Sequence, residues 1–596
     1  MNRFSTAPRP SRPHAGLPVL SVLAIALGCA GPAWAIDGGN IAAGTGTLQT
    51  QRNVTTVNQS SDRMVVNWQN FDIARNQTVN FQQPGASAAV LNRVSGSGKA
   101  SEILGSINAN GRVFVVNPDG VTFGRTARVD VGALVASALD TGNEQFMKLD
   151  GDVGNYGGGY LHFAGTTAGS VQNQGRINAT GSVALIGPQV VNRGTIQARQ
   201  VQLHAADVVA MNGQSLEATP TTPSSNAFAS NEGTIRAPGG DVVMSAAAIG
   251  NQIRDVVRNT GTIEATYAAT YEGGGIRLLA PVDGLIDLGG RVSASRLVEA
   301  TTQAAADFDG PMQAMSRYDR AATGRDVRVA KNALLTGEGM KQLSAYDGDL
   351  SVQGRVNGAI VDLRGDQVGL HGAVNATYDV NVKARKDVSQ SANVTTTKGH
   401  INMEGANIYQ GERTNTRAGN YISLSTPDQG GVYQKDGVVE VVPSNTYRSG
   451  RLRTGNLEAD SVALVSHDIE MNGRVKSRGD VQVIAMSEKF ICQAGAGEGC
   501  IALATTPGRV RQHGDVVSTE GSIRYSGGYL DQDATTRTRA ADTVFINASD
   551  VTAANIEAGK WVGINANSVT LKGRVVAPQV DLPANVRYEG GSVRRK

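Results

Sequence analysis

The sequence is poor in cysteine, histidine and aromatic residues, and neither sign of charge is in clear excess. Of its 596 residues, 3 are Cys and 7 are His, while Phe, Trp and Tyr together make up 5%. The 55 Lys and Arg residues nearly balance the 52 Asp and Glu residues. Because a nearly neutral chain has no general attraction for polyanions, we expect no nucleic-acid partner. The histidines are scattered singly, so we expect no metal site and no cofactor.

Motifs of catalysis are lacking as well. The chain contains no G-x-S-x-G nucleophile elbow, no H-E-x-x-H and no spacing that suggests a serine triad. Residues 94–99 end in Gly-Lys, but a phosphate-binding loop needs Gly at the position of Arg93. Asp349, Asp362 and Asp366 could be imagined as a polysaccharide-cleaving set, yet polar residues spaced like this are typical of any exposed strand. We therefore expect that the protein is not an enzyme.

The N-terminus has the features of an export signal. Three arginines and no acidic residue precede an apolar run at 17–27, and the segment ends in the small-x-small pattern that signal peptidase requires. Residues 1–35 are therefore predicted to be a signal peptide, cleaved between Ala35 and Ile36 after passage through the Sec translocon. The apolar run is too short to span a bilayer. Lipid attachment at Cys29 is the alternative, although the residues before it match that signal poorly.

Only Cys492 and Cys500 remain after cleavage. In an oxidising compartment, two cysteines this close in sequence favour a disulfide that closes a small loop. A metal pair is the alternative, but it would need nearby imidazoles, and His513 is the nearest one.

A seven-residue phrase, N-x-G-x-I-x-A, recurs in the first half of the chain. It occurs at 173–179, 192–198, 231–237 and 259–265, and degenerate copies extend in both directions. Asn and Gly favour a left-handed corner, the following Ile would point inward from a short strand, and its polar neighbour would point outward. Such a repeat is typical of a β-solenoid, in which each coil pairs with the coils above and below it. We expect an all-β rod.

Three segments interrupt this pattern and predict excursions from the rod. Residues 217–230 are rich in Pro, Ser and Thr and predict an exposed loop. Residues 297–322 are rich in Ala and Met with helical spacing, and the cysteine loop at 492–500 is the third. Each could carry a ligand contact or be a tolerated insertion.

Residues 65–137 contain a series of motifs in a fixed order. They are W-x-x-F-x-I at 68–73, V-N-F at 79–81, L-N-R-V at 91–94, A-N-G at 109–111, N-P-D-G at 117–120 and V-G-x-L-V-A-S at 131–137. With these motifs, residues 36–270 resemble the secretion domain of the filamentous haemagglutinin family, which comprises exoproteins of two-partner secretion in Gram-negative bacteria. Beyond 270 only the solenoid style continues, over 271–596. The family's usual turn is N-P-N-G, and its N-P-N-L motif has no literal copy here.

The resemblance implies a right-handed parallel β-helix that is capped by the secretion domain. It also implies a cognate outer-membrane barrel transporter with periplasmic recognition domains, through which the chain passes from the periplasm to the cell surface or the medium. The chain ends in YEGGSVRRK rather than in a barrel strand, so we expect this pore to be another polypeptide. Asn92, Arg93 and Val94, with Asn117, Pro118, Asp119 and Gly120, would serve transporter recognition and folding nucleation, or would simply form solenoid corners. Corner asparagines, Asn92 among them, could form an amide ladder.

The resemblance makes an adhesin with an unknown host or bacterial surface ligand the favoured function. A soluble haem, haem-carrier or nutrient-binding exoprotein is the alternative, and the L-N-R-V form suits the branch related to haem and haemopexin utilisation. A relative of toxin-delivery rods is a third hypothesis. The sequence also contains two integrin-type tripeptides, Arg364-Gly365-Asp366 and Arg478-Gly479-Asp480, which are weak receptor-binding candidates because chance copies are expected in a glycine-rich chain.

Overall fold

The computed structural model describes residue 36 and residues 38–95, 98–148, 159–247, 255–266, 274–281, 285–303, 326–345, 348–426, 432–435, 438–441, 450–492 and 500–596. These residues belong to one compact unit. The predicted signal peptide and Ala35 lie outside the described residues, so the structure does not bear on the cleavage site next to Ile36.

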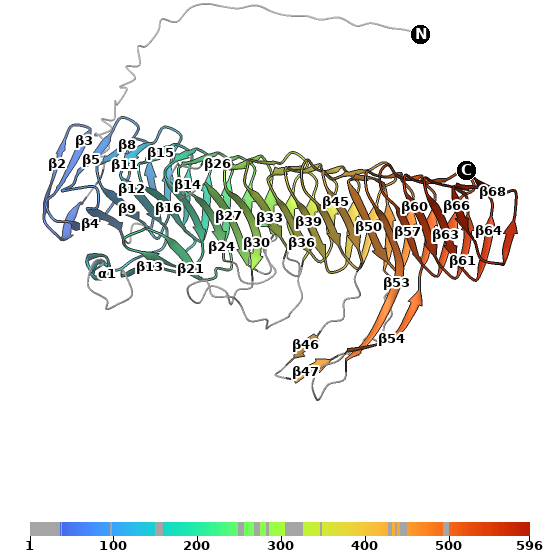
Figure 1. The fold of residues 1–596 in the computed structure, drawn as a ribbon. Coiled ribbons are helices and arrows are strands. Elements are labelled where there is room, and N and C mark those ends of the chain that lie inside the picture. The colour runs from blue at the N-terminus through green and yellow to red at the C-terminus, as the bar shows by residue number, and fades with distance from the viewer. Residues whose placement is uncertain are drawn as a thin grey trace, which may run out of the picture. The chain divides into compact units, whose positions relative to one another are not determined.

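The repeating unit is a coil of three short strands. One coil consists of β17 (Gln189–Asn192), β18 (Thr195–Gln197) and β19 (Gln200–Ala205). Each strand pairs in parallel and in register with its counterparts in the neighbouring coils, as β17 does with β14 (Ser170–Asn173) and β22 (Phe228–Asn231). Three long sheets result, here called sheet 1 (with β17), sheet 2 (with β18) and sheet 3 (with β19) (Figure 1). The predicted parallel β-helix is confirmed.

The repeated phrase builds the core of the rod. Its isoleucines, Ile177, Ile196, Ile235 and Ile263, pair directly from coil to coil in sheet 2 and are fully buried. Stacking like residues on like residues lets each coil bury its apolar side chains although no single coil could do so alone. The core is therefore continuous along the rod.

The asparagines of the phrase form a buried ladder. The amide of Asn173 donates to Asn192 (2.7 Å), that of Asn192 to Asn231 (2.7 Å), and that of Asn231 to Asn259 (2.8 Å). All four side chains are fully buried. Each amide thus satisfies the next, which removes the penalty for burying a polar group.

The glycines of the phrase have a different role from the one predicted. They do not adopt the left-handed conformation expected of a corner. A Cβ on Gly194 or Gly233 would instead lie 2.1 Å from the glycine carbonyl oxygen of the preceding coil. Glycine is needed because backbones approach closely at this corner, where a side chain would keep the coils apart.

Most insertions leave the rod between sheet 3 and sheet 1. The hairpin β46–β47 (Val432–Lys435 and Val438–Val441) does so, as does the long hairpin formed by β53 (Val481–Cys492) and β54 (Cys500–Pro507) (Figure 1). Residues 493–499 of the predicted cysteine loop lie outside the described residues.

Two predicted excursions are partly wrong. Residues 297–303 form a regular strand of sheet 3, β30 (Leu297–Gln303), which pairs with both neighbouring coils. Parallel pairing on both edges outweighs the helical spacing of this segment, and residues 304–325 are outside the described residues. The predicted loop at 217–230 contains β21 (Ala218–Thr222) and β22.

The N-terminal coil is closed by antiparallel strands. β1 (Asn40–Ala43) pairs with β4 (Arg63–Trp68) in sheet 3, and β2 (Gly46–Gln51) pairs with β3 (Val54–Gln59) in sheet 2. β1 and β2 thus cover the edges of the first parallel strands, so these edges cannot pair with a strand of another chain.

Candidate transporter-recognition region

The N-terminal coils carry a second layer on the outer face of sheet 3. It consists of α1 (Asn143–Met147) and an antiparallel sheet of β13 (Tyr160–Ala164), β20 (Val208–Asn212) and β21 (Figure 1). Phe114 of sheet 3 meets Phe146 of α1 edge to face, with ring centroids 5.1 Å apart. A second apolar core, which includes Leu91, Val135 and Phe163, fills the space between the layers.

A feature of the sequence indicates this layer, although the repeated phrase does not predict it. Strands β9 (Arg112–Val116), β12 (Ala133–Ser137) and β16 (Ser182–Gly187) are apolar at consecutive positions, not at alternate ones. A continuous apolar run is typical of a strand that is buried on both faces. The inward side chains enter the core of the rod, and the outward ones enter the second core.

Asn92 fastens three strands of this region together. It lies in β6 (Ala89–Val94), where its Oδ1 accepts a hydrogen bond from Trp68 Nε1 (3.0 Å) and its Nδ2 donates to the Phe114 carbonyl (3.1 Å). The side chain is fully buried. The expectation that Asn92 joins a ladder of corner asparagines is wrong, because its amide is used by Trp68 and Phe114. Val94 is also buried, in the core of the rod.

Arg93 ties the two layers with an ion pair. Its Nε donates to Asp140 Oδ1 at 2.8 Å, and Asp140 in turn forms a bridge with Ala164 at the end of β13. The hydrogen bond with Asp140 raises the pKa of the Arg93 guanidinium, so the guanidinium stays charged. The L-N-R-V segment thus contacts both the core of the rod and the second layer.

The N-P-D-G segment forms the predicted turn. The Gly120 N–H donates to the Asn117 carbonyl (2.9 Å), and Gly120 has a φ of 118°, which favours glycine. The Asn117 amide donates to the Lys99 carbonyl (2.9 Å) and to Ser101 Oγ (3.1 Å), while its oxygen accepts the Asp119 N–H (3.0 Å). The Pro118 carbonyl accepts the hydroxyl of Thr167.

Burial limits what a partner can contact at these motifs. Asn92, Val94 and Asn117 are buried, whereas Asp119 is exposed at the tip of the turn. A partner that contacts the buried motif residues must therefore bind before the chain folds. On the folded protein, Asp119 is the exposed residue of the turn. The structure brings the two motifs into one region but gives each a structural role.

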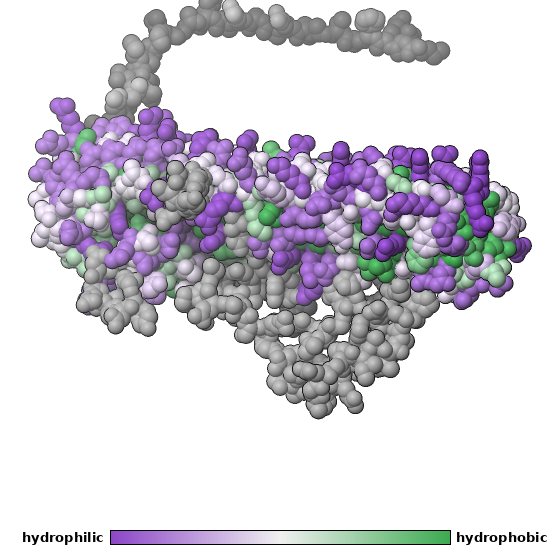
Figure 2. All heavy atoms as spheres, viewed as in Figure 1, coloured by the Kyte–Doolittle hydropathy of each residue, from purple (hydrophilic) through white to green (hydrophobic). Residues whose placement is uncertain are grey.

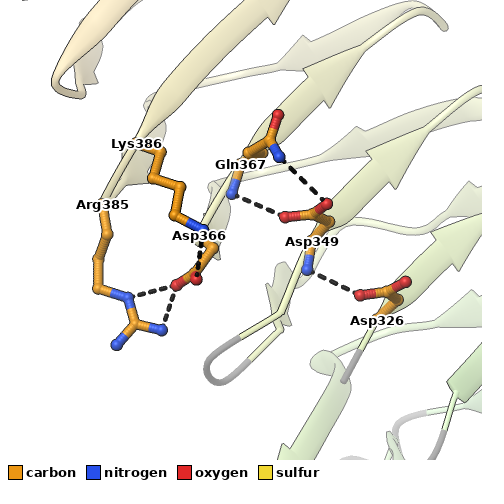
Figure 3. A network of polar contacts seen from close by, with 6 residues as sticks. All are labelled: Asp326, Asp349, Asp366, Gln367, Arg385 and Lys386. Atoms are coloured by element: carbon orange, nitrogen blue, oxygen red, sulfur yellow. Dashed lines mark hydrogen bonds and ion pairs between the residues drawn. The ribbon is translucent and has the colours of Figure 1, made fainter. Parts of the chain in front are cut away.

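The first integrin-type tripeptide is engaged in intramolecular contacts. Arg364, in β36 (Val361–Gly365), pairs with Asp362 at 2.8 Å. The carboxylate of Asp366 accepts from Arg385 and pairs with Lys386, whose Nζ lies 3.4 Å from Oδ2 (Figure 3). The acid that an integrin-type receptor would need is thus held between two cations of the next coil.

The second tripeptide is held in the same manner. Arg478 donates to Asp460 at 2.8 Å, and Asp480 Oδ1 accepts the Ser522 N–H at 2.8 Å. Gly365 is the last residue of β36, and Gly479 lies in the bend after β52 (Val475–Ser477). In both tripeptides the aspartate contacts the next coil, and receptor binding stays a prediction.

Cys492 and Cys500 are directly opposite each other in the β53–β54 hairpin. Opposed residues of an antiparallel pair have Cα atoms about 4.5–5.5 Å apart, and a disulfide needs about 4.4–6.8 Å. The backbone is therefore compatible with the predicted disulfide. Within the described ranges, no three His, Cys, Asp or Glu side chains gather as metal ligands would, and no helix is long and apolar enough to cross a membrane.

A capped parallel β-helix with a second layer over its first coils defines a β-helical protein with a distinct N-terminal region. Comparison with known families agrees, since residues 36–274 match the model of the TPS secretion domain, where TPS denotes two-partner secretion. Residues 36–274 are therefore a two-partner secretion domain, as the motifs of this region predicted. Such a domain implies a cognate outer-membrane transporter and secretion across the outer membrane.

Two curated relatives are heme/hemopexin-binding proteins of Haemophilus influenzae. One is 31% identical over 253 residues, which are 40% of this chain and 26% of that protein. The other is 40% identical over 98 residues, or 16% of this chain and 10% of that protein, so the matches span about a quarter and a tenth of the relatives' length. Among solved structures, the HMW1 secretion domain from Haemophilus influenzae is 18% identical and covers 94% of this chain and 100% of that chain, with a TM-score of 0.34.

Proposed function

We propose that the protein is an adhesin: a non-enzymatic extracellular rod that is exported through its transporter and binds a surface ligand. The single observation that supports this best is the two-layered region at 36–274, in which the export motifs hold together a capped rod. After it, the described strands continue the same coils apart from two hairpins, and no separate catalytic domain is found among them. A long rigid rod with hairpins on one side is suited to contact rather than to chemistry.

The carboxylates that could suggest catalysis serve the rod itself. Asp349 accepts the Gln367 N–H at 3.2 Å, and Asp326 accepts the Asp349 N–H at 2.9 Å, so the acids bridge successive coils (Figure 3). Burial raises the pKa of Asp349. Asp362 is paired with Arg364. These contacts support a structural role for the whole set.

A second candidate is binding of haem or a haem carrier, and the names of the two relatives favour it. The longer match covers 253 residues, close to the length of the secretion domain at 36–274, and leaves most of this chain unmatched. We rank this function second for that reason. Haemin titration, followed by absorbance near the Soret band, and capture by immobilised haemopexin would distinguish it from adhesion.

Fractionation of cells that make the protein with and without its barrel tests the proposal. We expect periplasmic retention without the barrel, and surface display with it, followed by adherence of the cells to host cells or matrix. Periplasmic accumulation in both strains would refute two-partner export. Release into the medium, with haemin or haemopexin binding and no adherence, would refute the adhesin and favour the second candidate.

A further inference from the structure

A trough follows the edge where sheet 2 turns into sheet 3 in the C-terminal part of the rod. It consists of two hollows of about 660 and 380 Å³ that share Thr519. The trough crosses seven successive strands of sheet 2: β41 (Val394–Thr396), β44 (Asn415–Arg417), β49 (Asn456–Ala459), β52 (Val475–Ser477), β56 (Val516–Ser518), β59 (Arg537–Ala540) and β62 (Asn555–Ala558). Six steps between strands of about 4.8 Å each make it about 29 Å long.

The floor of the trough is a column of small residues whose side chains turn inward, the alanines among them into the core of the rod. Ala459, Ser477, Ser518, Ala540 and Ala558 stand in register on successive strands, and all are buried. Because these side chains turn away from the trough, the outward side chains beside them rise above the floor.

One wall is an ion-pair ladder on the outer face of sheet 2. Arg417, Glu458 and Lys476 are successive partners in register, with Lys476 Nζ 2.9 Å and Arg417 Nε 3.8 Å from the Glu458 carboxylate. The hydrogen bond from Lys476 and the charge of Arg417 lower the pKa of Glu458, so it stays ionised. Further along, Arg539 and Glu557 repeat the pattern at 3.7 Å.

The opposite wall comes from the turns that follow the strands. Arg478 pairs with Asp460 at 2.8 Å, and the exposed side chains of Thr397, Thr519 and Glu520 complete it. Figure 2 shows hydrophilic side chains all along the upper edge of the rod, where Figure 1 places β15 (Arg176–Ala179), β26 (Thr262–Thr266) and β68 (Ser592–Arg595) of sheet 2.

We propose that the trough binds a linear, uncharged, hydroxyl-rich glycan that lies along the rod; this deepens the adhesin function proposed above and rests on it. On both walls cationic donors lie beside carboxylate acceptors, and a sugar hydroxyl can accept a hydrogen bond from the cation and donate one to the carboxylate. A polyanion would meet a carboxylate beside nearly every cation. An extended peptide would need an unpaired strand edge, whereas the trough strands pair with neighbours on both sides.

The test uses the purified mature chain on an array of linear neutral and acidic oligosaccharides, followed by calorimetric titration of the best neutral hexasaccharide. We expect neutral glycans to bind, and the double variant Lys476→Ala/Arg478→Ala to bind the hexasaccharide at least tenfold more weakly. Thr519→Trp, which fills the junction of the two hollows, should have a similar effect. Binding to acidic glycans alone, or to none, would overturn the proposal.

Arg453→Ala is the matched control. Arg453 pairs with Glu470 at 2.9 Å on sheet 1, and its side chain is 55% exposed, as is that of Lys476. This variant should bind within twofold of the parent, and an equal loss would show that the trough is not the site. Thermal unfolding checks that all variants fold. Export and adherence are scored separately, so a protein that is displayed and adheres without binding glycans refutes the trough alone.

Discussion

Replacing Lys341 should stabilise the protein. Lys341 lies in β33 (Met340–Ser344), and its side chain points into the core of the rod, where it is fully buried and pairs in register with Val361. Its Nζ donates to the carbonyls of Gly339 (2.9 Å) and Gly337 (3.3 Å), and no ion pair with a carboxylate is found for it among the described residues. The ammonium is thus buried with two carbonyl partners and no counter-ion.

The expected gain in the free energy of unfolding follows from the pKa of this lysine. Burial lowers its pKa from 10.5 to about 8. At about 1.4 kcal/mol per pKa unit, the charged form costs about 3 kcal/mol in the folded protein. The cost is full below pH 8, declines as the pH rises from 8 to 10.5, and is absent above that range, where both states are neutral. Lys341→Met keeps the volume and removes the charge, but it gives up two hydrogen bonds of about 1 kcal/mol each.

We therefore expect Lys341→Met to be about 1–3 kcal/mol more stable than the parent at pH 7, with the advantage shrinking towards pH 10. Guanidinium unfolding midpoints at both pH values measure it. Lys383→Met serves as the control, because Lys383 is 59% exposed and paired with Glu404, and its effect should be within about 0.5 kcal/mol at either pH. A variant less stable than the parent at pH 7, or an advantage that does not depend on pH, would refute the reasoning.

Four further predictions concern the N-terminal coils and the hairpin. Asn231→Ala breaks the buried ladder on both sides and should destabilise by about 2–3 kcal/mol, whereas Asn178→Ala, which loses an exposed bond to Asp130, should have little effect in thermal unfolding. Gly233→Ala would place a Cβ 2.1 Å from the Gly194 carbonyl and should lower the yield of folded protein, while Gly85→Ala, with open space around it, should not. Burial lowers the pKa of His204 to about 4; stability that is full above about pH 6.5 should fall as the pH drops from there towards 4, and the acid sensitivity should be reduced in His204→Gln. Mature protein made in the periplasm should show no free thiol on denaturation without reductant, and Cys492→Ala should show one. Two free thiols in the parent would argue against the predicted bridge.

The sequence predicts the architecture well because the architecture is periodic. Ile196 and Asn192 recur with the coil, so their inward positions follow from repetition alone. The second layer was not predicted, because β13 and β20 belong to no repeat and only the double-faced apolar strands indicate it. The role of Gly233 was mistaken because a single sequence shows that glycine is needed, but not whether φ or a neighbouring backbone requires it.

The candidate site is predictable only in part for a related reason. Motif order places Asn92 and Asn117 in one region, but the partners that bury them, Trp68 and Ser101, are set by coil pairing. The trough could not be foreseen, because its walls combine strands that are far apart in the chain. Arg417 and Glu458 are neighbours only because a long insertion leaves the rod between them.

One column of inward side chains in sheet 1 differs between the secretion-domain match and the rest of the rod. Along sheet 1 the buried ladder asparagines end at Asn259, and the next coils place Leu288, Val329, Val352 and Leu370 at the same position. Polar side chains return first as Gln390 and Gln410, which bond each other at 2.8 Å and share Thr416. They return again as Gln512 and Gln532, which are also buried and bond each other at 2.8 Å. The asparagine ladder thus ends within the secretion-domain match, at the point where the second layer has also ended. Buried polar pairs thus hold the coils together in both parts of the rod, as asparagines within 36–274 and as glutamines beyond it. The outward side chains of the later coils are free of this role, and there we place the ligand.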